Sequence, residues 1–556
     1  MAAIDVQTGA DGAAPVVEAA PAARRVHRVM AVVIAAFLVL GVRAVQLSFA
    51  GAPESARAPA PVVAAAPLPR ADIVDRHGVL LATTLPGFIL AAEPEKIWDP
   101  AAAARRLADA LPGLDAQETE RRLRSDRKLV YLRRGLTATQ RRQVHDLGIA
   151  GVTFETERRR VYPNGVLAGH ALGYVDRDQK GVAGLESALD EEIRRAAAAG
   201  RPFALSIDVR IQYALESELA DAAWAAKAKG AAAVILDATT GETLALASWP
   251  QVDPNAPGGG PEAARVNRAA GAVYEMGSTL KPFTAAMALE VDALRLAEPF
   301  DLTRAMTVDG VTIRDPHPFV GPATVREAMA HSSNVAMADL ALRVGADRQR
   351  AYLQKLGLFD RAGIELAESP APLRPRAEDR LTTAILGYGH GLAPSLVGLA
   401  GAYTVFANAG ARTTPTLRRH AEGDPIRMTP VFSSLAVTET LQLMRDVVVE
   451  GTAMRADLKG LDIAGKTGTA EKPGPDGKYD PDRLFSSFAA VFPAASPRYV
   501  MVLALDEPRR TAENGYLATG GAAAAPAVGR TVARIAPFLT AQNARPAAGG
   551  NERRDP

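Results

Sequence analysis

The 556-residue chain contains no cysteine, which excludes disulfide bridges, zinc–thiolate sites and cysteine nucleophiles. Aromatic residues make up 5% of the chain although 48% is hydrophobic, because alanine supplies much of the apolar content. Eight histidines are scattered without a pair at metal-ligand spacing, so we expect no metal or other cofactor. The 64 basic and 62 acidic residues leave a net charge of +2, which argues against a nucleic-acid partner.

Long apolar runs are scarce too, and one stands alone near the N-terminus. Val29 to Val42 is unbroken, and Arg43 alone interrupts its extension to Ala50. About 22 residues are enough to cross a bilayer, so we predict a single-pass anchor. Three arginines precede the run, which places the N-terminus in the cytoplasm and the rest of the chain outside it. These are Arg24, Arg25 and Arg28.

A cleaved signal peptide is the alternative to an anchor. Ser48-Phe49-Ala50 fits a small-x-small cleavage site, but the leader before the apolar run is long for a signal peptide. Under either interpretation the bulk of the chain is exported.

Beyond the anchor, strand patterns stand at both ends of a long helical region, which predicts an α+β fold with an antiparallel sheet flanked by helices. Strand patterns cover residues 72–80 and 152–161, a hairpin covers 231–236 and 243–248, and further strands cover 462–469, 486–492 and 499–505. The predicted order is a cytoplasmic tail (1–23), a transmembrane anchor (24–50), a Pro/Ala-rich linker (51–70), a first folded α+β region that we call the pedestal (71–205), a larger α+β domain (206–540) and a disordered tail (541–556).

Three short motifs in the catalytic region predict one reaction centre. They are Ser278-Thr279-Leu280-Lys281, Ser332-Ser333-Asn334 and Lys466-Thr467-Gly468-Thr469, spaced about 54 and then 134 residues apart. Together they match the signature of penicillin-recognising serine acyltransferases.

The first motif offers a nucleophile and a base. A helix beginning at or next to Ser278 would place Lys281, three residues on, on the same face and within reach of the hydroxyl. To act as a base Lys281 must be neutral, and both burial and a nearby Lys466 would lower its pKa. We therefore expect Lys281 to take a proton and Lys466 to stay charged.

The other two motifs are weaker alone. Ser332-Ser333-Asn334 falls on a predicted turn between two helices, where an ordinary helix cap would also place such residues. Residues 463–469 are predicted to form an edge strand with mostly small side chains. An extended peptide could add to this edge by main-chain hydrogen bonds.

Two other segments match the pattern of a functional site, and we interpret both as chance matches, or decoys. Ser125-Asp126-Arg127-Lys128 repeats the S-x-x-K spacing, but in an Arg-rich stretch that we interpret as a solvated face. Residues 460–467 match the P-loop pattern, yet Gly468 and Pro473 follow Lys466 and would break the helix that a P-loop requires there.

With these motifs the chain resembles the class B penicillin-binding proteins, the monofunctional peptidoglycan D,D-transpeptidases. The resemblance extends to Arg70–Gly78 and Gly184-Leu185-Glu186 in the pedestal, and to Asn267-Arg268-Ala269, Gly387-Tyr388-Gly389, Gly391 and Gly451-Thr452-Ala453 around the motifs. Ala71 and Met276 depart from the family pattern, which usually has glycine and proline there, and neither has a chemical role.

The resemblance implies a dimerisation-type pedestal, a transpeptidase domain and a role for each matched residue. Ser278 would be acylated by a stem pentapeptide, Lys281 would be the base, Ser332 would relay a proton and Asn334 would position the peptide amide. Lys466, Thr467, Gly468 and Thr469 would hold the terminal carboxylate, and the backbone N–H groups of Ser278 and Thr469 would form the oxyanion hole.

The resemblance is greatest to the division (septal) type, with the elongation type as the alternative. It implies an inner-membrane protein with a periplasmic catalytic domain, β-lactams as inhibitors, and a polytopic membrane glycan polymerase and divisome membrane proteins as partners. A β-lactamase is disfavoured because no Glu is followed by Asn four residues later. An inactive β-lactam-binding scaffold or sensor would require a broken motif, and none is broken.

Overall fold

The computed structural model describes residues 20–49, 70–421, 423–474 and 476–543. Contacts divide the chain into two units, Met1–Pro67 and Leu68–Pro556. The predicted linker (51–70) lies outside the described residues except for Arg70, and so do nearly all of the predicted tails (1–23 and 541–556). The last helix, α16 (Ala525–Asn543), runs three residues past the predicted end of the catalytic domain.

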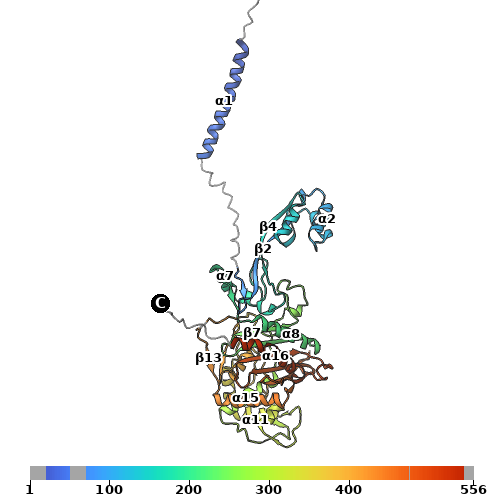
Figure 1. The fold of residues 1–556 in the computed structure, drawn as a ribbon, viewed down its shortest axis with the longest axis vertical. Helices are drawn as coiled ribbons and strands as arrows, with labels where there is room; N and C mark the ends of the chain where they lie inside the picture. Colours follow the sequence, from blue (N-terminus) through green and yellow to red (C-terminus); the bar gives the residue numbers. More distant parts are fainter. Residues whose placement is uncertain (1–19, 50–69, 422, 475, 544–556) are drawn as a thin grey trace, which may run out of the picture. The chain divides into compact units, whose positions relative to one another are not determined.

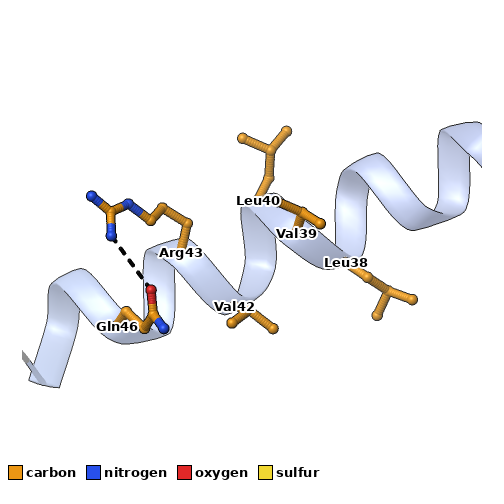
Figure 2. Close-up of a pocket in the computed structure, with 6 residues that line it drawn as sticks. All are labelled: Leu38, Val39, Leu40, Val42, Arg43 and Gln46. Carbon is orange, nitrogen blue, oxygen red and sulfur yellow. Dashed lines mark hydrogen bonds between the residues drawn. The ribbon is translucent and has the colours of Figure 1, made fainter.

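In the first unit the described residues form one helix, α1 (Ala20–Phe49), over the predicted anchor (Figure 1). Its described side chains, at 30–43 and 46, are exposed. Figure 2 shows Arg43 and Gln46 projecting together beside apolar neighbours, with Arg43 Nη1 donating to Gln46 Oε1 at 3.4 Å. Within the described part of the chain, no helix is both long enough and apolar enough to span a membrane. The anchor therefore stays a prediction.

The N-terminal part of the second unit is built around one long strand. β2 (Leu80–Ala92) pairs antiparallel with β4 (Val152–Val161) and β3 (Val130–Leu136). β1 (Ile73–Val74) pairs antiparallel with β2 and parallel with β5 (Phe203–Ala204). The helices of this region are α2 (Pro100–Ala110), α3 (Ala116–Leu123), α4 (Ala138–His145), α5 (Gly169–Leu172), α6 (Gly184–Ala188) and α7 (Asp190–Ala198).

The predicted strand over 72–80 is interrupted after two residues. Asp75 Oδ1 accepts hydrogen bonds from His77 N and Val79 N, at 2.7 and 2.9 Å, and Gly78 adopts φ 87°. This carboxylate therefore stabilises a tight turn in the middle of the predicted strand.

Buried charges join the pedestal strands to the helix that follows them. Glu186, in α6, accepts Arg70 Nε on one carboxylate oxygen at 2.9 Å and Arg160 Nε on the other at 2.7 Å. All three side chains are almost completely excluded from solvent. Each buried cation thus has a carboxylate partner, as burial of charge requires.

The catalytic region contains a five-stranded sheet in the order β14-β15-β16-β6-β7, antiparallel throughout. The bounds are β6 (Gly230–Asp237), β7 (Thr243–Trp249), β14 (Ala464–Pro473), β15 (Tyr479–Phe492) and β16 (Tyr499–Asp506). The predicted hairpin and the three later strands are confirmed. Because β6 and β16 lie inside the sheet, every residue in them is buried, and β14 forms an edge.

Helices cover this sheet and build a separate helical layer. α8 (Val209–Ala225) packs on β7 and against α16, and α14 (Leu396–Tyr403) contacts β6 and β16. α9 (Lys281–Glu290) contacts α11 (Asn334–Val344) and α15 (Ser434–Val449), the last of which also reaches β14. The remaining elements are α10 (Val325–Ala330), α12 (Ala346–Lys355), α13 (Arg380–Gly387) and the short strand pairs β8 (Phe300–Asp301) with β11 (Pro322–Ala323), β9 (Met306–Val308) with β10 (Val311–Ile313), and β12 (Ala411–Thr413) with β13 (Met428–Pro430). The α+β class and the antiparallel sheet are as predicted.

Candidate active site

Ser278 lies in a 3-10 turn (Gly277–Leu280) that runs directly into α9, close to the predicted helix start. Pro282 occupies the first turn of α9, where its missing N–H has no helical partner to lose. Gly277 has φ +54°, and a Cβ there would lie 2.9 Å from Thr469 O. Glycine therefore lets the nucleophile's turn lie directly against β14.

Lys281 is completely buried at the start of α9. Its Nζ lies within hydrogen-bond distance of three oxygen atoms: Ser332 O at 2.5 Å, Ser332 Oγ at 3.0 Å and Asn334 Oδ1 at 2.8 Å. The structure thus joins the first two motifs, although among the described residues nothing hydrogen-bonds the Ser278 hydroxyl itself. The expected contact of Lys281 with Ser278 is replaced by contacts with the second motif, which use all three hydrogen-bonding positions of the amine.

The second motif lies on the turn between α10 and α11, as predicted. Ser332 has φ 63°, a left-handed conformation that is uncommon outside glycine and is often found at functional sites. Ser333 caps α11, since its Oγ accepts from Ala336 N at 3.0 Å. The ordinary capping role therefore belongs to Ser333, while Ser332 and Asn334 are free to face Lys281.

Asp315, which sequence reasoning missed, fixes this turn. Its carboxylate accepts from Ser333 Oγ at 2.8 Å, from Val335 N at 3.0 Å and from Asn334 N. A carboxylate at the first turn of a helix is favoured by the unpaired N–H groups there. No motif spacing connects Asp315 to Ser332, so the sequence carried no signal for it.

The third motif lies on the edge strand β14. Lys466 is completely buried, and its Nζ donates to Ser332 Oγ at 3.0 Å and to Thr467 O at 3.2 Å. Thr467 Oγ1 lies 2.7 Å from Thr452 Oγ1, and Thr469 Oγ1 accepts from Gly520 N at 3.0 Å. The Thr469 hydroxyl proton is therefore available to a bound anion.

The two lysines differ in their expected protonation. Burial lowers the pKa of Lys281 well below its ordinary value, and the positive charge of Lys466 lowers this pKa further. Burial lowers the pKa of Lys466 to about 7. The direction of this shift favours the neutral form of Lys281, which is the form that a base requires. Lys466 was expected to stay charged, whereas a pKa of about 7 leaves it only partly protonated near pH 7, because burial removes the water that stabilises the ammonium.

A cavity of about 660 Å³ opens onto these motifs. It is lined by Ser278, Ser332, Asn334, Thr467 and Thr469, together with residues that the sequence did not single out as site residues. Thr452, Arg455, His390 and Glu471 are such additions, and of these only Thr452 lay in a segment noted for its family likeness. Among the described residues, no group of three His, Cys, Asp or Glu side chains is placed to hold a metal ion.

Neither decoy forms a site. Ser125 lies just past the end of α3, and its Oγ donates to Arg122 O at 2.7 Å. Lys466 is in the middle of a strand rather than at a helix N-terminus, which the P-loop geometry would need.

The fold and the site together define a serine acyltransferase. A half-buried serine lines the cavity, and Ser332, which lines it too, is hydrogen-bonded to a buried lysine with a depressed pKa and to a second buried lysine on an edge strand. Residues 231–533 match the family described as "Penicillin binding protein transpeptidase domain", and residues 65–200 match the "Penicillin-binding Protein dimerisation domain".

Curated relatives and a solved structure agree with this class. The probable peptidoglycan D,D-transpeptidase FtsI of Caulobacter vibrioides is 42% identical over 479 residues, covering 84% of this chain and 81% of the relative. FtsI of Escherichia coli is 29% identical, with 83% and 82% covered. The crystal structure of penicillin-binding protein 3 of Mycobacterium tuberculosis with aztreonam superimposes with a TM-score of 0.65 at 26% identity, covering 86% of this chain and 97% of that one.

The chain belongs to the class B penicillin-binding proteins, the peptidoglycan D,D-transpeptidases that β-lactams target, and it is most similar to the FtsI type.

Proposed function

We propose that the enzyme cross-links stem peptides through an acyl-enzyme on Ser278, during synthesis of the septal wall. The observation that carries the site assignment is that Lys281 Nζ and Lys466 Nζ each lie 3.0 Å from the single hydroxyl oxygen of Ser332. Motifs from three distant parts of the chain therefore share one hydrogen-bonded network. Ser278 lines the cavity onto which this network opens.

Proton transfer in this site follows from the charge states of the lysines. A neutral Lys281 has two N–H groups and one lone pair. Ser332 O and Asn334 Oδ1 accept the two N–H bonds, which leaves the lone pair to the Ser332 hydroxyl or, when substrate binds, to Ser278. Lys281 takes the Ser278 proton as Oγ attacks the peptide carbonyl. Ser332 then passes its own proton to the departing amine of D-alanine as the peptide bond breaks, and Lys281 returns a proton to Ser332, which leaves Lys281 neutral again.

Substrate binding uses the third motif. The peptide adds alongside β14, and its terminal carboxylate is bound by Lys466, Thr467 and Thr469. This carboxylate raises the pKa of Lys466 and so restores its positive charge. Asn334 orients the peptide amide, and the N–H groups of Ser278 and Thr469 bind the oxyanion, where each donor contributes about 3–4 kcal/mol.

Mass spectrometry of the penicillin-treated full chain tests the nucleophile. The adduct is expected on the peptide that contains Ser278, and Ser278→Ala should abolish it. Ser125→Ala is the matched control, because Ser125 has the same S-x-x-K spacing without the other motifs. An adduct that survives Ser278→Ala would contradict the assignment.

The septal role rests on similarity to proteins named FtsI, and it would bring a polytopic glycan polymerase and divisome membrane proteins as partners. A fluorescent fusion in growing cells should gather at the division site. Distribution along the side wall would instead support the elongation type.

The membrane anchor is part of the same proposal, with the catalytic domain on the periplasmic face of the inner membrane. Its support is the apolar run of residues 29–42 behind three arginines, and the continuous helix that the segment forms. Arg43, near the end of the run, reaches the outer interface by extending its side chain. N-terminal sequencing of membrane-extracted protein should find this segment intact, whereas a mature chain that starts at Gly51 would show cleavage.

A further inference from the structure

The active-site cavity differs in charge along β14. Lys466 is buried next to Thr467, which lines the cavity where we propose that the donor carboxylate binds. Glu471 lines that cavity too, five residues beyond Lys466 along the strand, about 17 Å away at roughly 3.4 Å per residue. Among the described residues Glu471 has no hydrogen-bonded or ion-paired partner, and it is exposed. A carboxylate-bearing ligand fits the Lys466 end, and a cationic ligand fits the Glu471 end.

His390 lines the same cavity as the nucleophile and Glu471. Its ring centroid lies 5.1 Å from Tyr388 and 6.2 Å from Tyr479. Its Nδ1 is buried and has no hydrogen-bond partner among the described residues. The imidazole is thus held in place by aromatic rings, with hydrogen-bonding capacity that the protein itself does not use.

The backbone fixes His390 against the nucleophile's turn. Gly389 has φ +96°, and a Cβ there would lie 1.8 Å from Gly277 O, so the loop directly contacts the residue before Ser278. Glu275, three residues before Ser278, accepts from Gly391 N at 2.9 Å and from the Tyr479 hydroxyl at 2.9 Å. Both flanks of His390 are therefore tied to the segment that carries the nucleophile.

The second half of the reaction needs a group with these properties. The amine that attacks the acyl-enzyme arrives as an ammonium ion at neutral pH, and it must lose one proton before its nitrogen can form a bond. Lys281 already receives the proton from Ser278, and its remaining hydrogen bonds go to the second motif. A separate acceptor for the ammonium proton would leave Lys281 free for the acyl transfer itself.

We propose that His390, with Glu471, forms the binding subsite of the attacking amine and that the imidazole takes the ammonium proton. This inference rests on the proposed function. Glu471 attracts the ammonium, and its proton moves to His390, which leaves a neutral amine and an imidazolium. The amine nitrogen then bonds to the acyl carbon as the bond to Ser278 Oγ breaks, and its second proton passes through Lys281 to that oxygen. The imidazolium releases its proton to solvent.

The charges around His390 fit a proton acceptor. Burial lowers the pKa of His390, and Lys281 lowers it too, while Glu275 and Glu471 raise it. The other titratable groups that pack against the ring are the hydroxyls of Tyr388 and Tyr479. The imidazole is therefore neutral at neutral pH, and the two carboxylates favour the imidazolium once it forms.

The test separates acylation from amine transfer in the full-length protein. The donor is a D-alanyl thioester, and the attacking amine is D-alaninamide, which has no carboxylate. His390→Gln should lower the ratio of aminolysis to hydrolysis at least about 10-fold, within the range of general-base contributions. In the wild-type enzyme, aminolysis should fall in acid partly because His390 becomes protonated. This part of the fall should be absent from the variant. His145→Gln, on an exposed helix of the pedestal, is the control for a histidine change elsewhere.

Penicillin acylation is measured in parallel, because it needs Ser278 and Lys281 but no amine. An unchanged aminolysis ratio and acid limb in His390→Gln would overturn the proposal, and so would a parallel fall of acylation and aminolysis. Glu471→Gln is a second variant on an exposed side chain, where folding is not at risk, and it should raise the KM for the amine. An unchanged KM would remove Glu471 from the subsite. Failure of wild-type acylation would instead contradict the proposed function.

Discussion

Two pairs of buried basic side chains in this molecule are stabilised in opposite ways. In the pedestal, Arg70 and Arg160 share the carboxylate of Glu186. In the active site, Lys281 and Lys466 share the neutral hydroxyl of Ser332, and among the described residues neither lysine has an ion-pair partner. Pairing makes the first cluster structural. The unpaired lysines respond by changing protonation state, which is what catalysis requires.

The largest expected effect separates the two lysines of the active site. Lys281→Arg should lower the rate of penicillin acylation by about 10⁴-fold, because a guanidinium cannot be deprotonated and so cannot act as a base. Lys466→Arg should retain part of the activity, since it keeps the charge. Stopped-flow acylation of both variants checks this, and equal losses would show that the lysines do not have separate roles.

The pedestal cluster should respond in stability rather than in acylation chemistry. Glu186→Gln leaves the buried Arg160 without its carboxylate partner and Arg70 with Asp190 alone, and it should lower the free energy of unfolding by about 3–5 kcal/mol. Chemical denaturation measures it. Glu118→Gln breaks exposed helical ion pairs with Arg121 and Arg122 and should cost no more than about 1 kcal/mol. A comparable cost in both variants would mean that burial does not distinguish the clusters.

Sequence reasoning was strongest where chemistry is concentrated in short patterns. The three motifs, the turn at Ser332 and the edge position of Lys466 all followed from local sequence. Asp315, His390 and the bond from Lys281 to Ser332 did not, because they depend on contacts between segments whose spacing follows no rule. The strand predicted at 72–80 was wrong for a similar reason, since the turn depends on one carboxylate, Asp75.

Asp315 provides an intermediate effect. Asp315→Asn removes the negative charge that binds Ser333 and the first N–H groups of α11. The side chains of Ser332 and Asn334 should therefore be held less firmly in their positions. Acylation should fall by up to about 100-fold, as small displacements of reacting groups can cause. Ser278 should still be the modified residue in mass spectra. An unchanged acylation rate would show that Ser332 and Asn334 hold their positions without Asp315.

A smaller effect concerns how much the buried Lys281, which has no ion-pair partner among the described residues, lowers the free energy of unfolding. Lys281→Met should raise the free energy of unfolding by about 0.5–2 kcal/mol at pH 7, as replacement of strained active-site groups often does. The pKa of Lys281 is lower in the folded chain, so the unfolded chain binds more protons at pH 7 and wild-type stability rises toward pH 10. The advantage of the variant should therefore shrink at pH 10. A destabilised variant at pH 7 would indicate that Lys281 is charged and stabilising.

The pH dependence of penicillin acylation tests the central claim most directly, because it reports the protonation of both lysines in the free enzyme. The wild-type rate should fall in acid as Lys281 gains a proton, and it should fall again as the pH rises past about 7, the pKa at which Lys466 loses its charge. In Lys466→Arg the alkaline fall should disappear while the acid limb remains. The same alkaline fall in both proteins would contradict the account, because it would show that Lys466 is not the buried cation on which substrate binding depends.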